Sequence, residues 1–211
     1  MKSRKETRTS RLAISAAATS LLAAGIISPS TATAQEQYFY VVNQGTNMVA
    51  EVFAHNTADG AATVLWTNYG GESEQFRMDF HDDGWFTLTA KHSGKCLGRA
   101  YSSSSSSVIQ KSCPSLNEEK DLWRTQEIRK TASDCANVNQ CFGGSRTVLQ
   151  NKYGGGRFCL DAANATAPKP PGEGAGLQTW TCIKKFGDWN AVNQDWRLVK
   201  TQDWGSGPVV R

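Results

Sequence analysis

Five side chains in the last third of the chain have the chemistry needed to bind a polyhydroxylated ring. They are one carboxylate, three amides and one indole: Asp161, Gln178, Trp180, Asn193 and Gln194. A carboxylate can accept hydrogen bonds from two neighbouring hydroxyls, and charge-assisted bonds are the stronger kind. An amide can donate and accept at once, and an exposed indole can cover the apolar C–H face of a pyranose.

The triplet Gln-x-Trp occurs twice in this region, at Gln178/Trp180 and at Gln194/Trp196. The aromatic residue of the second copy has counterparts elsewhere in the chain, and that of the first copy does not. An aromatic residue followed by Arg stands at three places along the chain, at Phe76, Trp123 and Trp196. A residue that every repeating unit requires is expected to belong to the core. Trp180 does not recur together with its neighbours, so we predict that it faces a ligand.

Three segments share an alternating apolar stretch, a polar turn with Gly or Asn, and a second short apolar stretch. They begin at Tyr38, Trp85 and Thr147. This pattern is typical of β-hairpins. The starts are 47 and 62 residues apart, and repeats of this length are each too small to bury their own apolar face. We therefore predict an all-β barrel with threefold pseudo-symmetry over residues 35–200, with repeats at about 36–82, 83–130 and 146–200. The C-terminal tail at 201–211 is expected to be disordered, except that Trp204 could cap the barrel.

Residues 1–34 have the layout of a secretory signal peptide. A basic start precedes the apolar stretch Leu12 to Ile27, and Ala32-Thr33-Ala34 is an A-x-A cleavage site. The apolar stretch is shorter than the ~20 residues that span a bilayer. The sequence thus predicts a secreted, extracellular protein that begins at Gln35 and does not insert into a membrane.

The basic charge of the chain belongs to this leader. It holds five of the 23 Lys and Arg residues and one of the 19 Asp and Glu residues, which leaves 18 of each in the remainder. Nucleic-acid binding requires a basic surface, so we predict no nucleic-acid partner.

Six cysteines follow the leader, at Cys96, Cys113, Cys135, Cys141, Cys159 and Cys182. An even number in an oxidising compartment favours three disulfides, although spacing alone leaves their pairing open. A zinc site is the competing interpretation. The chain has no C-x-x-C pair and its three histidines are scattered, so we predict no metal and no other cofactor.

These motifs resemble the ricin B-type lectin family, a β-trefoil in which each repeat ends in Gln-x-Trp. The resemblance extends over about residues 36–200 and is most specific in the third repeat, where FCLDAA, LQTWTC and NQDW occur in the family's order. It implies a disulfide within a repeat, which pairs Cys159 with Cys182 and Cys96 with Cys113. Cys135 and Cys141 would then pair with each other.

The resemblance also implies a galactose-type sugar site in the third repeat. There Asp161 would accept from the sugar, Trp180 would stack on it, and Gln178 and Asn193 would bond its hydroxyl edge. Gln194 would hold Asp161 in position without contacting the sugar itself. The long insertion at residues 165–176 lies between Asp161 and Trp180, and we expect it to affect which sugar is bound.

The other two repeats depart from this pattern. The second has Gly98 in place of the carboxylate, Ile109 and Lys111 in place of Gln178 and Trp180, and Lys120 and Asp121 before its Trp123, so no sugar is expected there. The first keeps a carboxylate and an indole but lacks the amides and both cysteines: it has Glu51, Val64, Trp66 and Ser73.

The sequence favours a secreted, non-catalytic carbohydrate-binding protein with one site, for galactose-type sugars or for a plant or microbial polysaccharide. The alternative is a trefoil that binds a protein, as an inhibitor or as the cell-targeting subunit of a toxin or enzyme. A glycosidase requires two carboxylates that face each other across the scissile bond. The adjacent acids Asp82 and Asp83 fall instead in an Asp-Gly turn, so we predict no enzyme activity.

Overall fold

The computed structural model of the chain describes residues 36–81, 83–113, 118–129, 145–164, 169–183 and 189–205, all of which lie in the unit Gln35–Arg211. The predicted signal peptide and the cysteines Cys135 and Cys141 fall outside these residues. Within them, no helix is long and apolar enough to cross a membrane.

Each of the three predicted repeats folds into four antiparallel strands. The first contains β1 (Tyr38–Asn43), β2 (Val49–Val52), β3 (Thr63–Trp66) and β4 (Gln75–Phe80). The second contains β5 (Phe86–Ala90), β6 (Cys96–Arg99), β7 (Ser106–Lys111) and β8 (Trp123–Arg129). The third contains β9 (Ser145–Asn151), β10 (Phe158–Ala162), β11 (Leu177–Thr181) and β12 (Trp196–Lys200).

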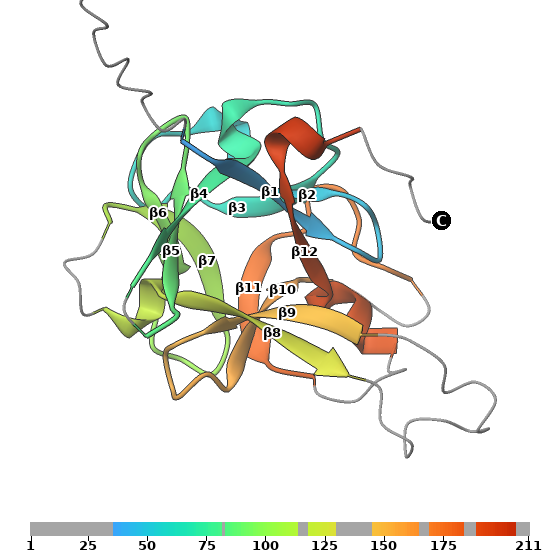
Figure 1. Cartoon of the computed structure of the whole chain (residues 1–211). Helices are drawn as coiled ribbons and strands as arrows, with labels where there is room; N and C mark the ends of the chain where they lie inside the picture. Colours follow the sequence, from blue (N-terminus) through green and yellow to red (C-terminus); the bar gives the residue numbers. More distant parts are fainter. Residues whose placement is uncertain are drawn as a thin grey trace, which may run out of the picture. The chain divides into compact units, whose positions relative to one another are not determined.

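The first and last strands of the repeats form a barrel (Figure 1). β1 pairs with β4, β4 with β5, β5 with β8 and β8 with β9. β9 lies against β12, and β12 pairs with β1, with Asn43 opposite Trp196 and Phe39 opposite Lys200. The ring of strands is thereby closed, which removes the exposed edges of an open sheet.

The middle strands of each repeat form a hairpin, and the three hairpins β2–β3, β6–β7 and β10–β11 meet over one end of the barrel. β7 pairs with β11, and the bridge Ala62 to Ile109 joins the first hairpin to the second. Short 3-10 turns lead into the closing strands of the repeats: η2 (Glu72–Glu74), η3 (Glu119–Asp121) and η6 (Trp189–Gln194). The hairpins and the turns together position the side chains considered below.

The closing aromatics fill the core, as their recurrence predicts. Phe76, Trp123 and Trp196 are fully buried in one cluster with apolar residues from all three repeats. The two indoles are also fixed by hydrogen bonds, because Nε1 of Trp123 donates to the carbonyl of Leu97 and Nε1 of Trp196 to the carbonyl of Leu160, each at 2.9 Å. The all-β trefoil prediction is confirmed.

The connections between paired strands follow the predicted turns. In the first repeat Asn47 adopts a left-handed φ of 59°, and in the second Gly94 does so at 68°. The backbone N–H of Asn47 donates to the carbonyl of Asn43, and that of Gly94 donates to the carbonyl of Ala90, each at 2.8 Å. Asn and Gly tolerate this conformation better than other residues, which explains why the turns carry them.

Two of the three predicted disulfides are present among the described residues. Cys96 bonds Cys113 and Cys159 bonds Cys182, so both pairings implied by the family resemblance are confirmed. The expectation of a disordered tail is wrong for its first residues, because they pack on the barrel. η7 (Thr201–Asp203) follows β12, and the ring of Trp204 meets that of Tyr40 edge-on, with centroids 5.2 Å apart.

The recurrence of the closing aromatic generates a prediction about stability. Replacing Trp196→Phe or Trp123→Phe should preserve the fold, because the first repeat already carries Phe76 at this position. Each change should lower the free energy of unfolding by about 1–3 kcal/mol, from the lost hydrogen bond and the smaller ring. Chemical denaturation measures this, with Tyr101→Ala as a control at an exposed aromatic, expected within ~0.5 kcal/mol of the parent. Equal stability of the Phe variants and the parent would contradict the role given to the indoles.

Candidate functional site

The hairpin β10–β11 places three of the five candidate side chains on one face. Asp161 lies directly opposite Gln178, and Cys159 lies opposite Trp180. Residues that face each other across an antiparallel pair share a side of the sheet, as do residues two apart in a strand. Gln178 and Trp180 therefore stand beside Asp161, and the Cys159–Cys182 disulfide ties the same hairpin to the chain beyond it.

The turn η6 brings the remaining two amides to the same carboxylate. Nδ2 of Asn193 donates to Oδ2 of Asp161 at 2.6 Å, and Nε2 of Gln194 donates to the same oxygen at 2.9 Å. Gln194 is itself fixed, because its Oε1 accepts from the backbone N–H of Ile183 at 2.9 Å. The predicted orienting role of Gln194 thus matches its position in the structure.

Gln178 and Asn193 hold a different position from the one expected from the sequence. We expected both to face a ligand's hydroxyls, yet Nε2 of Gln178 donates to Oδ1 of Asp161 at 2.9 Å, so all three amides converge on the carboxylate. Oδ1 of Asn193 is left buried with no donor among the described residues.

Burial dominates the electrostatics of this carboxylate. Asp161 is only 2% exposed. Loss of solvent raises its pKa above the ordinary value, and the hydrogen bonds from Gln178 and Gln194 oppose the rise only in part. An incoming hydroxyl must reach Asp161 past Gln178, which is partly exposed, while Trp180 is 49% exposed beside it. The arrangement is a shielded acceptor next to an open aromatic surface.

The second repeat contains a carboxylate that the sequence analysis did not place in a site. Gly98 and Lys111 occupy the positions of Asp161 and Trp180, since Gly98 faces Ile109 and Cys96 faces Lys111. The fully buried carboxylate of Asp121, from η3, fills the space next to Gly98, where an added Cβ would lie 1.8 Å from Oδ1. Nζ of Lys111 lies 2.7 Å from the same oxygen. The place in the second repeat that corresponds to the Asp161 site is therefore occupied by the ion pair between Lys111 and Asp121.

In the first repeat, a tyrosine hydroxyl is hydrogen-bonded to the buried carboxylate. Glu51 is buried opposite Val64, and Trp66 stands at the position of Trp180. The hydroxyl of Tyr69 donates to Oε1 of Glu51 at 2.8 Å, and burial raises the pKa of Tyr69 to about 12. His55 completes this cluster, with Nε2 3.2 Å from the Tyr69 hydroxyl. Sequence reasoning missed Tyr69 and His55 because both lie in irregular connections that no repeat or motif marks.

The long insertion of the third repeat contacts the first repeat. The amide of Gly174 donates to the carbonyl of Leu65, the amide of Leu65 donates to the carbonyl of Ala175, and a bridge joins Val64 to Gly176. Residues 174–176 of the insertion therefore pair with β3, and Gly174 lies close to Trp66. We expected this segment to affect which sugar is bound at Asp161, and these contacts connect it to the first repeat.

Among the described residues, no three or more His, Cys, Asp or Glu side chains are grouped closely enough to hold a metal ion. The convergent polar groups at Asp161 are one carboxylate and neutral amides. Such a set suits hydroxyl groups better than ions.

A family model supports the resemblance that the motifs indicated. The model described as "Ricin-type beta-trefoil lectin domain-like" matches residues 27–112. This segment covers the first repeat and the second repeat as far as β7, whereas the most specific motifs lie in the third repeat. The resemblance to ricin B-type lectins is thus confirmed from a different part of the chain. No curated protein matches the chain in sequence.

Solved structures of similar fold include designed and natural proteins. The designed threefold symmetric protein ThreeFoil is 26% identical, with a TM-score of 0.58, and the match covers 77% of this chain and 97% of that one. A ricin B-like lectin from Macrolepiota procera in complex with lactose is 15% identical, with a TM-score of 0.53 and coverage of 80% and 99%. An exo-β-1,3-galactanase from Clostridium thermocellum is 17% identical, with a TM-score of 0.57, and the match covers 78% of this chain but 30% of the enzyme.

The close approach of Gly98 to Asp121 generates a prediction for the second repeat. Gly98→Ala should lower the free energy of unfolding by about 1–3 kcal/mol, because the new methyl group overlaps a buried carboxylate. The same change made in an Asp121→Ala background should cost much less, since the overlapping atoms are gone. Denaturation of the two single variants and the double variant gives the coupling energy. An equal cost of Gly98→Ala in both backgrounds would show that Asp121 does not restrict this site.

Proposed function

We propose that the protein is a secreted, non-catalytic lectin whose third repeat binds a galactose-type sugar. The observation that carries this proposal is the convergence of Gln178, Asn193 and Gln194 on Asp161 beside the half-exposed ring of Trp180. The description of the matching family model as a lectin domain supports it, as does the lactose complex of the Macrolepiota procera lectin. Secretion is proposed from the signal-peptide layout of residues 1–34.

In the proposed complex, Trp180 covers the C–H face of the sugar while two of its hydroxyls replace or share the donors around Asp161. Gln178 is the donor that yields, because it lies on the open side of the carboxylate. Gln194 stays in place, since it also accepts from Ile183. A neutral donor exchanged for a hydroxyl conserves the number of hydrogen bonds, so the exchange costs little.

A protein partner is the second candidate function, and the first two repeats favour it. Their carboxylates are bonded internally, to Tyr69 and to Lys111, which leaves the surface around them available for another use. Binding of this kind would not require Trp180 or Asp161. The two candidates therefore differ in their dependence on these residues.

Trp180→Ala and Asp161→Ala should each abolish glycan binding on an array probed with the purified protein. For Trp180→Ala we expect at least a tenfold loss of affinity, about 1.4 kcal/mol, without loss of stability because the ring is half exposed. Tyr101→Ala is the matched control, since Tyr101 is 69% exposed and lies outside the site. Binding to a galactose-terminated glycan that survives both substitutions would overturn the third-repeat site, and absence of binding to every glycan would favour a protein partner.

The raised pKa of Asp161 predicts how sugar binding depends on pH. The ionised carboxylate accepts from sugar hydroxyls, and protonation removes part of that capacity. Affinity should therefore be constant near neutrality and fall in acid, with a midpoint above the ~3.9 of an ordinary aspartate. Titration calorimetry with the best array ligand at a series of pH values measures this midpoint, with circular dichroism at each pH to show that the fold persists. A midpoint at or below the ordinary value would contradict the burial argument.

A further inference from the structure

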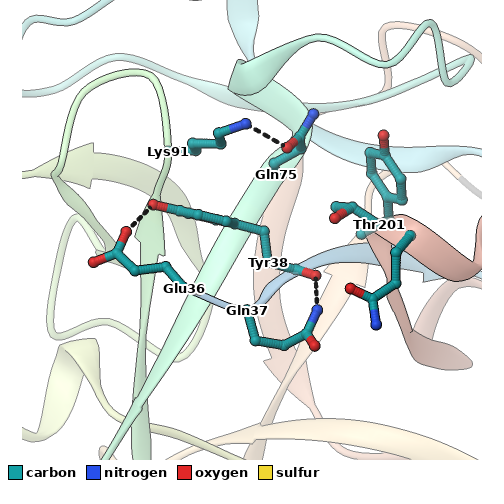
Figure 2. A pocket seen from close by; sticks show the side chains of 8 residues that line it. Glu36, Gln37, Tyr38, Gln75, Lys91 and Thr201 are labelled. Atoms are coloured by element: carbon teal, nitrogen blue, oxygen red, sulfur yellow. Dashed lines mark hydrogen bonds between the residues drawn. The ribbon is translucent and has the colours of Figure 1, made fainter. Parts of the chain in front are cut away.

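A hollow lies beside the first strand of the barrel, and neither the motifs nor the family resemblance assigned it a role. It has a volume of about 460 Å³, which is within the range of small-molecule binding sites. Its walls come from the start of β1, from β4, from the residue after β5 and from η7. Figure 2 shows the ring of Tyr38 projecting from the chain, with Lys91 and Gln75 on one side and Gln37 on the other.

The charges in this hollow are already paired. Nζ of Lys91 lies 3.2 Å from a carboxylate oxygen of Glu72, and Glu36 lies 2.6 Å from the guanidinium of Arg77. A phosphate or carboxylate ligand would have to compete with Glu72 for Lys91. An uncharged ligand meets no such competition, so the hollow favours neutral polar molecules.

The remaining lining groups are amides and hydroxyls. Gln37, Gln75, Thr201 and Gln202 border the hollow. Gln75 is fixed at both ends, because Oε1 accepts from Lys91 at 3.1 Å and Nε2 donates to the carbonyl of Gly70 at 3.0 Å. Gln202 is exposed and Thr201 is partly exposed. The hollow therefore has one rigid amide wall and one wall that can adjust to a ligand.

Tyr38 is held in place before any ligand arrives. Its hydroxyl donates to Glu36 at 2.5 Å, and Nζ of Lys91 lies 5.2 Å from the centre of its ring. An aromatic ring held among amides and hydroxyls can contact the C–H groups and the hydroxyls of a sugar together. We propose that this hollow, formed by Tyr38, Gln75, Lys91, Thr201 and Gln202, is a second saccharide-binding site.

The two sites lie at opposite ends of one strand. β12 begins two residues after Gln194 and ends at Lys200, next to Thr201. Five residues of strand and the flanking positions separate the sites by roughly 15–20 Å, so one sugar ring cannot occupy both. One chain with two weak sites would be retained on a dense glycan surface by avidity. This inference takes its ligand class from the proposed function but stands on different residues.

Backbone and ring NMR signals of the purified protein test the proposal, with lactose, cellobiose and maltose as probes up to about 10 mM, above the ~1 mM dissociation constant of a weak site. We expect at least one disaccharide to shift the signals of Tyr38, Lys91 and Gln202. These shifts should persist in Trp180→Ala. Tyr38→Ala should lower the affinity measured from the Lys91 and Gln202 signals at least tenfold, and Tyr101→Ala should not.

Gln202→Trp provides a second variant that does not depend on removing a partly buried ring. Position 202 is exposed, so the indole should fill the hollow without unfolding the protein, and it should abolish the shifts at Tyr38 and Lys91. Persistence of those shifts in Gln202→Trp would overturn the proposed site.

The outcomes separate this proposal from the proposed function. Shifts around Asp161 and Trp180, with none in the hollow for any disaccharide, would overturn the second site and leave the third-repeat site standing. Shifts in the hollow alone would support the second site and contradict the third-repeat site. A response of the hollow to a blocked Gly-Gly peptide and to no disaccharide would assign it to a protein partner and overturn the saccharide proposal.

Discussion

The whole structure depends on burying one aromatic ring from each repeat at the centre of the barrel. A unit of some forty to sixty residues with four short strands has one apolar face and cannot cover it alone. Phe76, Trp123 and Trp196 solve this together, since they lie in a single cluster with apolar side chains from every hairpin. The hydrogen bonds from the two indoles to Leu97 and Leu160 tie this core to the hairpins. Because the core fixes the hairpins, it also fixes the side chains that stand on them.

The sequence was sufficient for the features that repeat or that obey local chemistry. The alternating stretches predicted the strands, the Gly and Asn turns predicted the hairpins, and the closing aromatic predicted the core. The side chains proposed as a sugar site around Asp161 lie together, because they stand on a hairpin and a turn whose pairing the repeat defines. The family resemblance was needed for the disulfides, since spacing alone does not choose among pairings.

The sequence was insufficient where a side chain's partner comes from an irregular segment. Tyr69 reaches Glu51 from a loop with no period, and Asp121 occupies space that only the absence of a Cβ at Gly98 makes available. Gln178 and Asn193 have the residue types expected of a ligand site, yet composition cannot show that their N–H groups turn inward to Asp161. The contact between residues 169–176 and β3 is likewise a long-range pairing that no local signal encodes.

Each repeat carries a buried carboxylate near the same place, and the partners of these carboxylates decide which place is available to a ligand. An unpaired buried charge costs several kcal/mol, so every repeat must supply partners. Lys111 forms an ion pair with Asp121, and displacing Lys111 for a ligand would leave the buried carboxylate of Asp121 unpaired. Tyr69 covers Glu51 with a hydroxyl held by several neighbours. Asp161 is held by neutral amides, and one of them, Gln178, is partly exposed. In the proposed function, exchange of a neutral amide donor for a sugar hydroxyl would leave the charge of Asp161 satisfied throughout, which is why we assign the sugar to the third repeat.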